Sequence, residues 1–410
     1  MPQPPTAYPD FDSMPIGGTW RSGRAGRALD DTDPWSGSTL ATIPLADAGD
    51  VAEAYQAAAE AQRSWSSALP EVRAKVLRDA VTILDERHAE IAGWITRESG
   101  GTVAKVEIEL GVVRAGFLEA ASMPHHAEGR IIPSDIPGKE NRVYREPVGV
   151  VCLISPWDFP LYLTNRTLAP ALALGNAVVI KPSSNTPVTG GLLLARILEE
   201  AGLPPGVLNV VVGSSDDIGD VLVSHPVPRV VSFTGSTEVG RDISRRAGIK
   251  RLLFELGGNA PMVILDDADL EQAVPAAVFG SFYNSGQICM IGNRIVVDAS
   301  LHDEFVDRFV KLTRSLSVGD PADPATFIGP VISRHQLESV IDKVDRAIDQ
   351  GATLLTGGRP TGPACLALPP HVLLGTNEVA TAQEEVFGPA ITIIEADGED
   401  HALAIANGTP

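Results

Sequence analysis

Cys289 is the residue of this chain whose surroundings best suit covalent chemistry. It lies in the segment FYNSGQICM, after a Gly-Gln pair at an expected helix end, where backbone N–H groups can stabilise a thiolate. Cys152, in an apolar run, and Cys365, in a loop rich in proline and glycine, are expected to be structural. Because a buried structural role is the commoner one for a lone cysteine, Cys289 needs support from other residues.

Two further segments contain groups that complement a nucleophile. In FELGGNAP, Glu255 is expected at a strand end and is followed by two glycines that permit a sharp turn, so its carboxylate could act as a general base on water. The segment FTGSTEVG runs from a strand through a glycine into a helix expected to begin near Ser236. The N-terminus of such a helix can bind a phosphate without a longer glycine motif.

The common cofactor and metal motifs do not occur in this sequence. There is no GxGxxG, no P-loop, no HExxH and no CxxC. Three scattered cysteines are too few for a disulfide framework or a zinc cluster, so no metal is expected.

Composition excludes several classes of partner. The formal net charge of the 410 residues is −20, and a chain this acidic repels nucleic acids and anionic membranes. The start of the chain has no basic-then-apolar signal, and the longest apolar stretch, near Leu168–Ile180, is too short to span a bilayer. We therefore expect a cytoplasmic protein.

The elements that must hold these residues are of the α/β type. Helices are expected from Asp50 as N-cap, from Pro70 to about Ile95, and over Val103–Met123. Short β-branched runs then alternate with helices at 189–201 and 216–224, which indicates a parallel sheet covered on both faces. The expected strands are Gly149–Ser155, Ala177–Lys181, Val207–Val212 and Val230–Thr234.

A second α/β region is expected after Glu255. Its predicted strands are Met262–Leu265 and Ile295–Val297, and its predicted helices are Asp266–Tyr283 and Leu301–Arg314. Between the helical start and the first sheet, residues 129–147 are predicted to form an extended excursion with a turn at Pro137–Gly138.

Taken together, these motifs resemble the aldehyde dehydrogenase superfamily over essentially the whole chain. Six supporting motifs occur in the family's order: IGGTWRSG, YREPVGVV, SPWDFPLYL, KPSSNTP, FTGSTEVG and EEVFGP. The segments GQICMIGNR, ESGGTVAKVEIE and SPWDFPLYLTNR look most like the benzaldehyde dehydrogenase-like branch.

The resemblance implies a division into domains. It implies a Rossmann-type, parallel-sheet cofactor domain over residues 1–128 and 148–255, and a second α/β catalytic domain over 256–410. Residues 129–147 would be an oligomerisation arm. The family continues for several tens of residues beyond IANGTP, so the chain is expected to be a C-terminally incomplete member whose complete form is a homodimer or homotetramer.

The resemblance also implies a reaction. Cys289 would add to an aldehyde, preferably an aromatic one, and NAD or NADP would take the hydride. Glu255 would then activate the water that hydrolyses the resulting thioester to a carboxylic acid. Because Glu255 is present, hydrolysis is expected rather than transfer to coenzyme A.

The cofactor residues are carried over motif by motif. Lys181 and Ser236 would hold the ribose and phosphate regions, Glu385 the nicotinamide ribose, and Phe387 would pack beside the nicotinamide. The complete predicted cofactor set is Ser155, Pro156, Trp157, Lys181, Ser184, Gly213, Phe233, Gly235, Ser236, Leu256, Glu385 and Phe387.

Two residues depart from the family pattern. Asp158 stands where the family has an Asn whose amide donates to the alkoxide, and an ionised carboxylate there would repel the developing charge. A protonated Asp158, or Asn165 standing in, would remove that conflict. Ser184 replaces a Glu that disfavours a 2′-phosphate, so NADP is expected to bind comparably to or better than NAD.

Two other functions stay open at this point. A catalytically impaired cofactor-binding or structural relative would account for Asp158 and for the early end of the chain. A hydrolytic triad of Cys289, Glu255 and Lys181 would be nitrilase-like, but it leaves FTGSTEVG and EEVFGP unexplained.

Overall fold

The computed structural model describes residues 6–409 and contains two compact units. Unit 1 comprises residues 6–31, Thr39–Ile95 and Ile108–Glu255, and unit 2 begins at Leu256. Two short segments that precede Leu256 in sequence, Thr32–Ser38 and Thr96–Glu107, also belong to unit 2. Nothing in the sequence pattern indicated that these two segments would belong to unit 2.

The sheet of unit 1 has five parallel strands. They are β7 (Val150–Ile154), β8 (Ala177–Lys181), β9 (Leu208–Val210), β10 (Pro228–Thr234) and β11 (Arg251–Glu255). Their spatial order is β11-β10-β7-β8-β9, so the chain builds outward from β7 and then returns to its other side. The strand order therefore reverses between β7 and β10, the kind of position where parallel α/β sheets bind ligands at their carboxyl ends.

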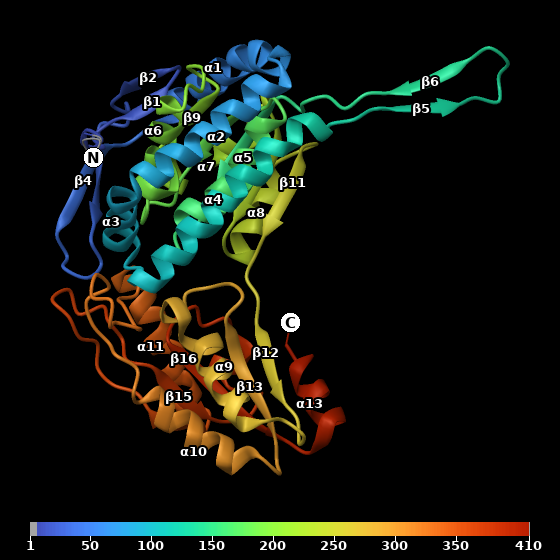
Figure 1. Cartoon of the computed structure of the whole chain (residues 1–410). Helices are drawn as coiled ribbons and strands as arrows, with labels where there is room; N and C mark the ends of the chain where they lie inside the picture. The colour runs from blue at the N-terminus through green and yellow to red at the C-terminus, as the bar shows by residue number, and fades with distance from the viewer. Residues whose placement is uncertain (1–5, 410) are drawn as a thin grey trace. The chain divides into compact units, whose positions relative to one another are not determined.

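Helices accompany this sheet (Figure 1). The strands β7 and β8 are almost wholly buried, which explains why they read as continuous apolar runs. The helices are α1 (Ala48–Ser67), α2 (Pro70–Glu86), α3 (His88–Ser99), α4 (Val103–His126), α5 (Pro160–Ala173), α6 (Leu193–Glu200), α7 (Ser215–Ser224) and α8 (Thr237–Arg246).

Several helix boundaries differ from the sequence prediction; the helix predicted from Asp266, for example, begins at Leu270 after an N-cap at Asp269. The N-cap of α1 is Asp47, and Asp50 is instead its N3 partner in a reciprocal capping box. The helix expected from Pro70 to Ile95 is two helices, because α2 ends at a C-cap at Arg87. The segment Val188–Leu192 is a π-helical turn, η1, ahead of α6.

The first fifty residues contain four short strands that the sequence did not indicate. They pair as two separate two-stranded sheets. Each strand has three to six residues, which is too short for a clear alternation of apolar and polar side chains. They are β1 (Met14–Ile16), β2 (Thr19–Arg21), β3 (Ala28–Thr32) and β4 (Thr39–Pro44).

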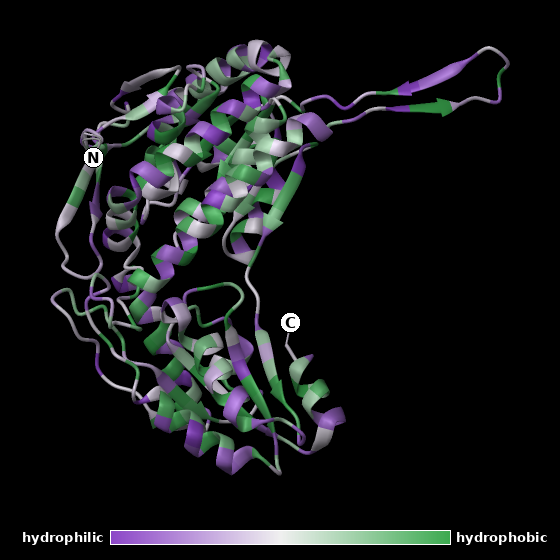
Figure 2. Cartoon of the chain, viewed as in Figure 1, coloured by the Kyte–Doolittle hydropathy of each residue, from purple (hydrophilic) through white to green (hydrophobic). Residues whose placement is uncertain are grey.

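The excursion at residues 129–147 is an antiparallel hairpin of β5 (Arg130–Pro133) and β6 (Glu140–Val143). Gly138 adopts a φ of +76° in its turn, which suits glycine. The hairpin extends away from the body of unit 1 (Figure 1), with β5 largely hydrophobic and β6 largely hydrophilic (Figure 2). Ile131 and Ile132 of β5 are exposed.

Unit 2 is built on a second five-stranded sheet in the order β12-β13-β16-β15-β14. The first four of these strands are mutually parallel, and β14 is an antiparallel edge strand. The strands are β12 (Ala260–Ile264), β13 (Gly292–Asp298), β14 (Thr353–Thr356), β15 (His371–Leu374) and β16 (Ala390–Ala396). The helices are α9 (Leu270–Phe282), η2 (Tyr283–Gly286), α10 (His302–Thr313), α11 (Arg334–Asp349), α12 (Ala380–Gln383) and α13 (Gly398–Ala406).

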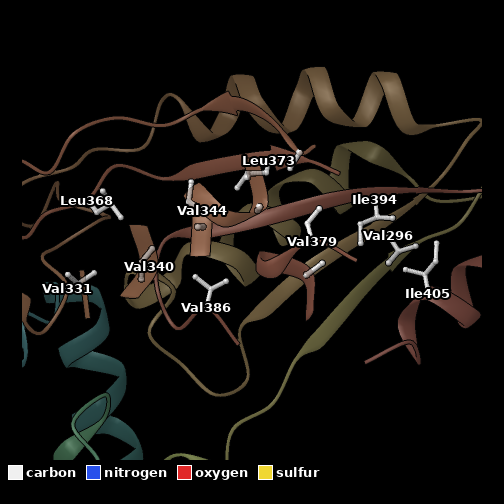
Figure 3. Packing of buried hydrophobic residues seen from close by; sticks show 14 of the residues in the cluster. Val296, Val331, Val340, Val344, Leu368, Leu373, Val379, Val386, Ile394 and Ile405 are labelled. Atoms are coloured by element: carbon white, nitrogen blue, oxygen red, sulfur yellow. The ribbon is translucent and has the colours of Figure 1, made fainter. Parts of the chain in front are cut away.

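Two apolar clusters form the core of unit 2. Alternation along β13 places Val296 in one cluster, and Ile295 and Val297 in the other. The first cluster takes Val340 and other residues of α11 and the loop before β16 (Figure 3). The second takes phenylalanines of α9 and α10. The central strands are thus buried on both faces.

Within residues 6–409, the structure contains no helix that is both long enough and apolar enough to cross a membrane.

Candidate active site

The carboxyl edge of the unit 1 sheet collects most of the predicted cofactor residues. Each lies at or just beyond the end of one of four neighbouring strands, β7, β8, β9 and β10, on both sides of the switch point. They are Ser155, Pro156 and Trp157 after β7, Lys181 and Ser184 at and after β8, Gly213 after β9, and Phe233, Gly235 and Ser236 at the end of β10.

The amine of Lys181 is buried and has little hydrogen bonding to the protein. Its side chain is 6% exposed, and its Nζ donates to the Pro182 carbonyl at a long 3.4 Å. Burial lowers the pKa of Lys181, since the charged form is poorly solvated there. An ammonium in this state favours ligand oxygens such as ribose hydroxyls.

The N-terminus of α8 is arranged as an anion site. The helix begins next to Ser236, as the sequence predicted, and the Ser236 hydroxyl caps it by accepting the Val239 N–H at 3.3 Å. A Cβ at Gly235 would lie 2.6 Å from Cζ of Phe233, so glycine leaves room for that ring beneath the turn. The first amides of α8 remain directed along the helix axis, where a phosphate can accept them.

Buried hydrogen bonds fix the loop that contains Asp158. The Ser155 N–H donates to the Lys181 carbonyl at 3.1 Å, and the Ser155 hydroxyl to the Gly190 carbonyl at 3.3 Å. At the start of α5, the buried Glu109 carboxylate accepts the N–H groups of Leu161 and Tyr162 at 2.9 and 3.1 Å. Asp158 itself is 5% exposed, so its position is set by this framework rather than by solvent.

Asn165 is held by a buried hydrogen bond within unit 1. Its Nδ2 donates to the Val113 carbonyl at 3.2 Å, and its buried Oδ1 accepts no hydrogen bond from any described residue. The Nδ2 group carries a second hydrogen, so Asn165 keeps one donor beyond its bond to Val113.

Glu255 ends the edge strand β11 and forms an ion pair that the sequence did not indicate. Nη2 of Arg166, on α5, lies 2.5 Å from its Oε1. The two side chains are 48% and 51% exposed, so the pair contributes about 0–1 kcal/mol to stability. The ion pair therefore matters more for the direction of the Glu255 carboxylate than for the stability of the fold. No local sequence signal links these two residues, because 89 positions separate them.

In unit 2 the candidate residues lie at the amino ends of three adjacent parallel strands. Leu256 and the following glycines precede β12, Cys289 precedes β13, and Glu385 and Phe387 precede β16. The three strands are neighbours in the order β12-β13-β16, so their amino ends form one edge.

Cys289 lies in a tight turn rather than at a helix N-terminus. Helix α9 ends at Phe282, and the chain runs from Cys289 into β13 without starting a new helix. The 3-10 helix η2 ends at Gly286, so Cys289 follows a helix end as expected but lies in a separate turn. The thiol is partly buried.

Three consecutive residues ahead of this turn have left-handed backbone angles. The φ values of Asn284, Ser285 and Gly286 are 51°, 56° and 71°. Hydrogen bonds hold this path, because Nδ2 of Asn284 donates to the Gln287 carbonyl at 3.0 Å and Oε1 of Gln287 accepts the Ile332 N–H at 2.9 Å. Such strain is typical of a functional loop.

The two glycines after Glu255 serve close approach. Neither Gly257 nor Gly258 has a positive φ, so the sharp turn predicted from them is not their role. A Cβ at Gly257 would lie 2.3 Å from Oε2 of Glu385, and one at Gly258 would lie 3.5 Å from the Cys289 carbonyl oxygen. The Gly258 N–H also donates to Oε1 of Glu385 at 3.3 Å.

A pair of side-chain amides, one of them buried, fixes the loop that contains Glu385. Oδ1 of Asn293 accepts the Val386 N–H at 3.0 Å, and its Nδ2 donates to Oδ1 of Asn259 at 2.9 Å. Val386 is buried in the first core cluster (Figure 3), whereas its neighbours Glu385 and Phe387 are only partly buried. Phe387 has a φ of 54°, and its carbonyl accepts from Gln336 at 2.7 Å.

The part of the chain that the structure describes contains no cluster of three His, Cys, Asp or Glu side chains suited to a metal ion.

Comparison with known proteins identifies the family. The sequence profile described as the aldehyde dehydrogenase family matches residues 20–410. The chain belongs to the aldehyde dehydrogenase family. The resemblance inferred from the six motifs is therefore confirmed.

Individual relatives of this aldehyde dehydrogenase support its resemblance to the benzaldehyde dehydrogenase-like branch. A vanillin dehydrogenase of Corynebacterium glutamicum is 45% identical over 399 residues, which cover 96% of this chain and 82% of the relative. A benzaldehyde dehydrogenase of Bacillus subtilis is 44% identical, over 98% of this chain and 83% of the relative. The crystal structure of an NAD-dependent benzaldehyde dehydrogenase from C. glutamicum matches with a TM-score of 0.93 and 45% identity, over 98% of this chain and 86% of that one. The predicted α/β fold is likewise confirmed.

The Cys289 turn of this aldehyde dehydrogenase should not tolerate a side chain at Gly286. Its φ is +71°, and a Cβ there would lie 2.1 Å from the Gly388 carbonyl oxygen. We expect Gly286→Ala to lower the free energy of unfolding by about 3 kcal/mol or more, since backbone overlap adds to about 1–2 kcal/mol of left-handed strain. Denaturant unfolding measures the loss.

Gly398→Ala is the matched control, because Gly398 has a φ of +79° and a Cβ there would meet nothing within 4 Å. It should lose only the left-handed strain. Equal losses in the two variants would show that the contact with Gly388 carries no weight.

The contributions of Glu385 and of its neighbour Glu384 to folding stability should change with pH in opposite directions. Burial raises the pKa of Glu385, whereas the hydrogen bond from Arg346 lowers the pKa of Glu384. The contribution of Glu385 to stability is therefore present at low pH and lost as pH rises through its raised pKa. That of Glu384 is present at neutral pH and lost on acidification.

Accordingly, Glu385→Gln should raise the melting temperature at neutral pH, and the gain should fade on acidification. Glu384→Gln should lower it at neutral pH. Thermal unfolding of both variants between about pH 4 and pH 8 measures the difference. A loss of stability at neutral pH in Glu385→Gln would contradict the burial argument.

Proposed function

We propose that this aldehyde dehydrogenase oxidises aromatic aldehydes to carboxylic acids with NAD or NADP, through a thioester on Cys289. The observation that carries the proposal is the position of Gly258. It lies against the Cys289 carbonyl and donates to Glu385, in the segment that directly follows Glu255. The proposed nucleophile and the proposed cofactor carboxylate thus both lie beside the backbone segment that follows the proposed base. The vanillin and benzaldehyde dehydrogenases among the relatives support an aromatic substrate.

Two features of unit 1 fit a dinucleotide. The underpartnered Lys181 amine at the end of β8 suits ribose hydroxyls, and the Ser236-capped start of α8 suits a phosphate. Both lie at the carboxyl edge of the sheet, beside the switch point between β7 and β10. In unit 2, Glu385 would accept from the nicotinamide ribose and Phe387 would pack beside the ring. When bound, the nicotinamide supplies a hydride acceptor.

Cys289 and Glu255 divide the chemistry into two steps. The thiolate of Cys289 bonds to the aldehyde carbon, and loss of hydride from that carbon leaves a thioester. Glu255 then takes a proton from water, whose oxygen bonds to the thioester carbon while the Cys289 sulfur leaves. Products are the carboxylic acid and the free thiolate.

Ser184 bears on the choice between the two cofactors. It is exposed, three residues beyond Lys181, and it brings no negative charge to this part of the edge. We propose that a 2′-phosphate is tolerated here and that NADP binds comparably to or better than NAD, since no carboxylate at position 184 repels it.

Different parts of the chain are expected to bind the cofactor, to supply the nucleophile and to mediate self-association. We propose that residues 1–128 and 148–255 bind the cofactor, that 256–410 supply the nucleophile, and that the hairpin at 129–147 serves self-association into a homodimer or homotetramer. The exposed apolar side chains of β5 and the unpaired outer edges of both strands support a role in pairing with another strand.

The central test is oxidation of benzaldehyde in the presence of each cofactor, followed by the absorbance of the reduced nicotinamide. Cys289→Ala should abolish turnover, whereas Cys365→Ala, at an exposed thiol, should retain it. Glu255→Gln should slow hydrolysis and leave an acyl-enzyme visible in the intact mass. Turnover by Cys289→Ala at the unmodified rate would refute the nucleophile.

A second test concerns the alkoxide that forms when Cys289 adds to the aldehyde. We propose that buried Asp158 faces this oxygen and that its carboxylate opposes the negative charge. Asp158→Asn should raise kcat by about ten- to thousandfold, because an amide donates where the carboxylate repels. The steady-state rate at saturating benzaldehyde measures the change.

Asp216→Asn, at an exposed position of α7, is the control and should leave kcat unchanged. An unchanged kcat in Asp158→Asn would show that this position does not touch the alkoxide.

A further inference from the structure

The segment of α5 that contains Arg166 is held firmly in place. The residues around it on α5 are each anchored to a different part of unit 1. Thr164 donates to the Gly190 carbonyl at 3.0 Å, Asn165 to the Val113 carbonyl at 3.2 Å, and the Thr167 hydroxyl bonds that of Ser232, in β10, at 3.0 Å. The backbone that presents the guanidinium is therefore fixed against the sheet.

Glu255 has a fixed backbone but an exposed side chain. Its carbonyl accepts the Gly235 N–H at 3.1 Å, and its backbone pairs with Thr234 of β10. The strand β11 is at the edge of the sheet, so it has a neighbouring strand on one side only. A half-exposed glutamate in this position would sample several rotamers unless another group held its carboxylate.

We propose that Arg166 is a positioning residue for the general base. Its Nη2 bonds Oε1 of Glu255 at 2.5 Å, which restricts the carboxylate and leaves Oε2 to accept the proton of the hydrolytic water. This inference rests on the proposed function of Glu255. The guanidinium suits the task because it stays charged and its planar donors fix direction as well as distance.

This role confines Arg166 to the second half of the reaction. Addition of Cys289 to the aldehyde and loss of hydride need no base at Glu255. Hydrolysis does, since water gives its proton to Oε2 as its oxygen bonds to the thioester carbon and the Cys289 sulfur leaves. A misdirected carboxylate slows this step alone.

The test measures the two halves separately in the complete chain. Rapid mixing with benzaldehyde and cofactor gives the rate of hydride transfer from the first turnover. The intact mass of samples quenched over time gives the rate at which the acyl-enzyme decays. We expect Arg166→Met to leave the first rate within about twofold and to slow the second about tenfold. Arg166→Lys should recover part of the loss, because an ammonium keeps the charge but not the planar geometry.

Arg114→Met is a matched control. Arg114 lies on α4 and pairs with Asp85 at 3.0 Å, and these side chains are 48% and 52% exposed, nearly the same as Arg166 and Glu255. Loss of a generic surface ion pair from unit 1 is therefore equal in both variants. Acyl-enzyme decay in Arg114→Met should match the unmodified protein.

A double variant separates positioning of Glu255 from other effects. Arg166→Met combined with Glu255→Gln should decay no more slowly than Glu255→Gln alone, since Arg166 acts through that carboxylate. Decay at the unmodified rate in Arg166→Met, faster decay, or additive losses in the double variant would each overturn the inference. If the unmodified chain forms no acyl-enzyme, or if Glu255→Gln does not slow its decay, the proposed function itself fails.

Discussion

A side chain at position 257 would place its Cβ 2.3 Å from a carboxylate oxygen of Glu385. The absence of that atom allows this close contact, which ties two loops of the unit 2 edge together. It lets the backbone that follows Glu255 pass close to Glu385 and to the Cys289 carbonyl before it enters β12. Gly257 contributes here by leaving space for the Glu385 carboxylate, since neither Gly257 nor Gly258 has a positive φ. Three loops that precede three different strands are thereby brought within reach of one another.

Buried polar groups hold those loops in place. Asn259 and Asn293 join the β12 and β16 loops through an amide pair, and the fully buried Arg294 donates to the carbonyls of Asn259, Ile405 and Ala406. Burial lowers the pKa of Arg294. These partners of Arg294 are neutral, and the last two are carbonyls at the C-terminal end of α13, where the helix dipole is negative. A buried cation held in this way is costly to disturb, so the framework resists rearrangement.

The two sheets present their candidate residues with opposite polarity. Unit 1 uses the carboxyl ends of parallel strands, where the reversal of strand order between β7 and β10 opens a place for a ligand. Unit 2 uses the amino ends of β12, β13 and β16. Strand-end loops can be strained and polar because the strands behind them are buried and rigid. The left-handed residues at Asn284, Ser285 and Phe387 occur in such loops.

The sequence by itself determined the family, the α/β class and the short apolar strands, because buried parallel strands need continuous β-branched runs and because nucleophile, base and phosphate-binding turn are local motifs. It also located the helix that Ser236 caps, since capping is local. Other features depended on contacts between distant segments. Arg166 meets Glu255 across 89 positions, Asn165 gives its amide to Val113, and Gly257 makes room for Glu385. The short strands of the first fifty residues and the turn at Cys289 were also beyond local pattern, because the packing of remote segments overrode weak local preference. Tertiary structure alone decided these features, since each depends on which distant atom comes within a few ångströms.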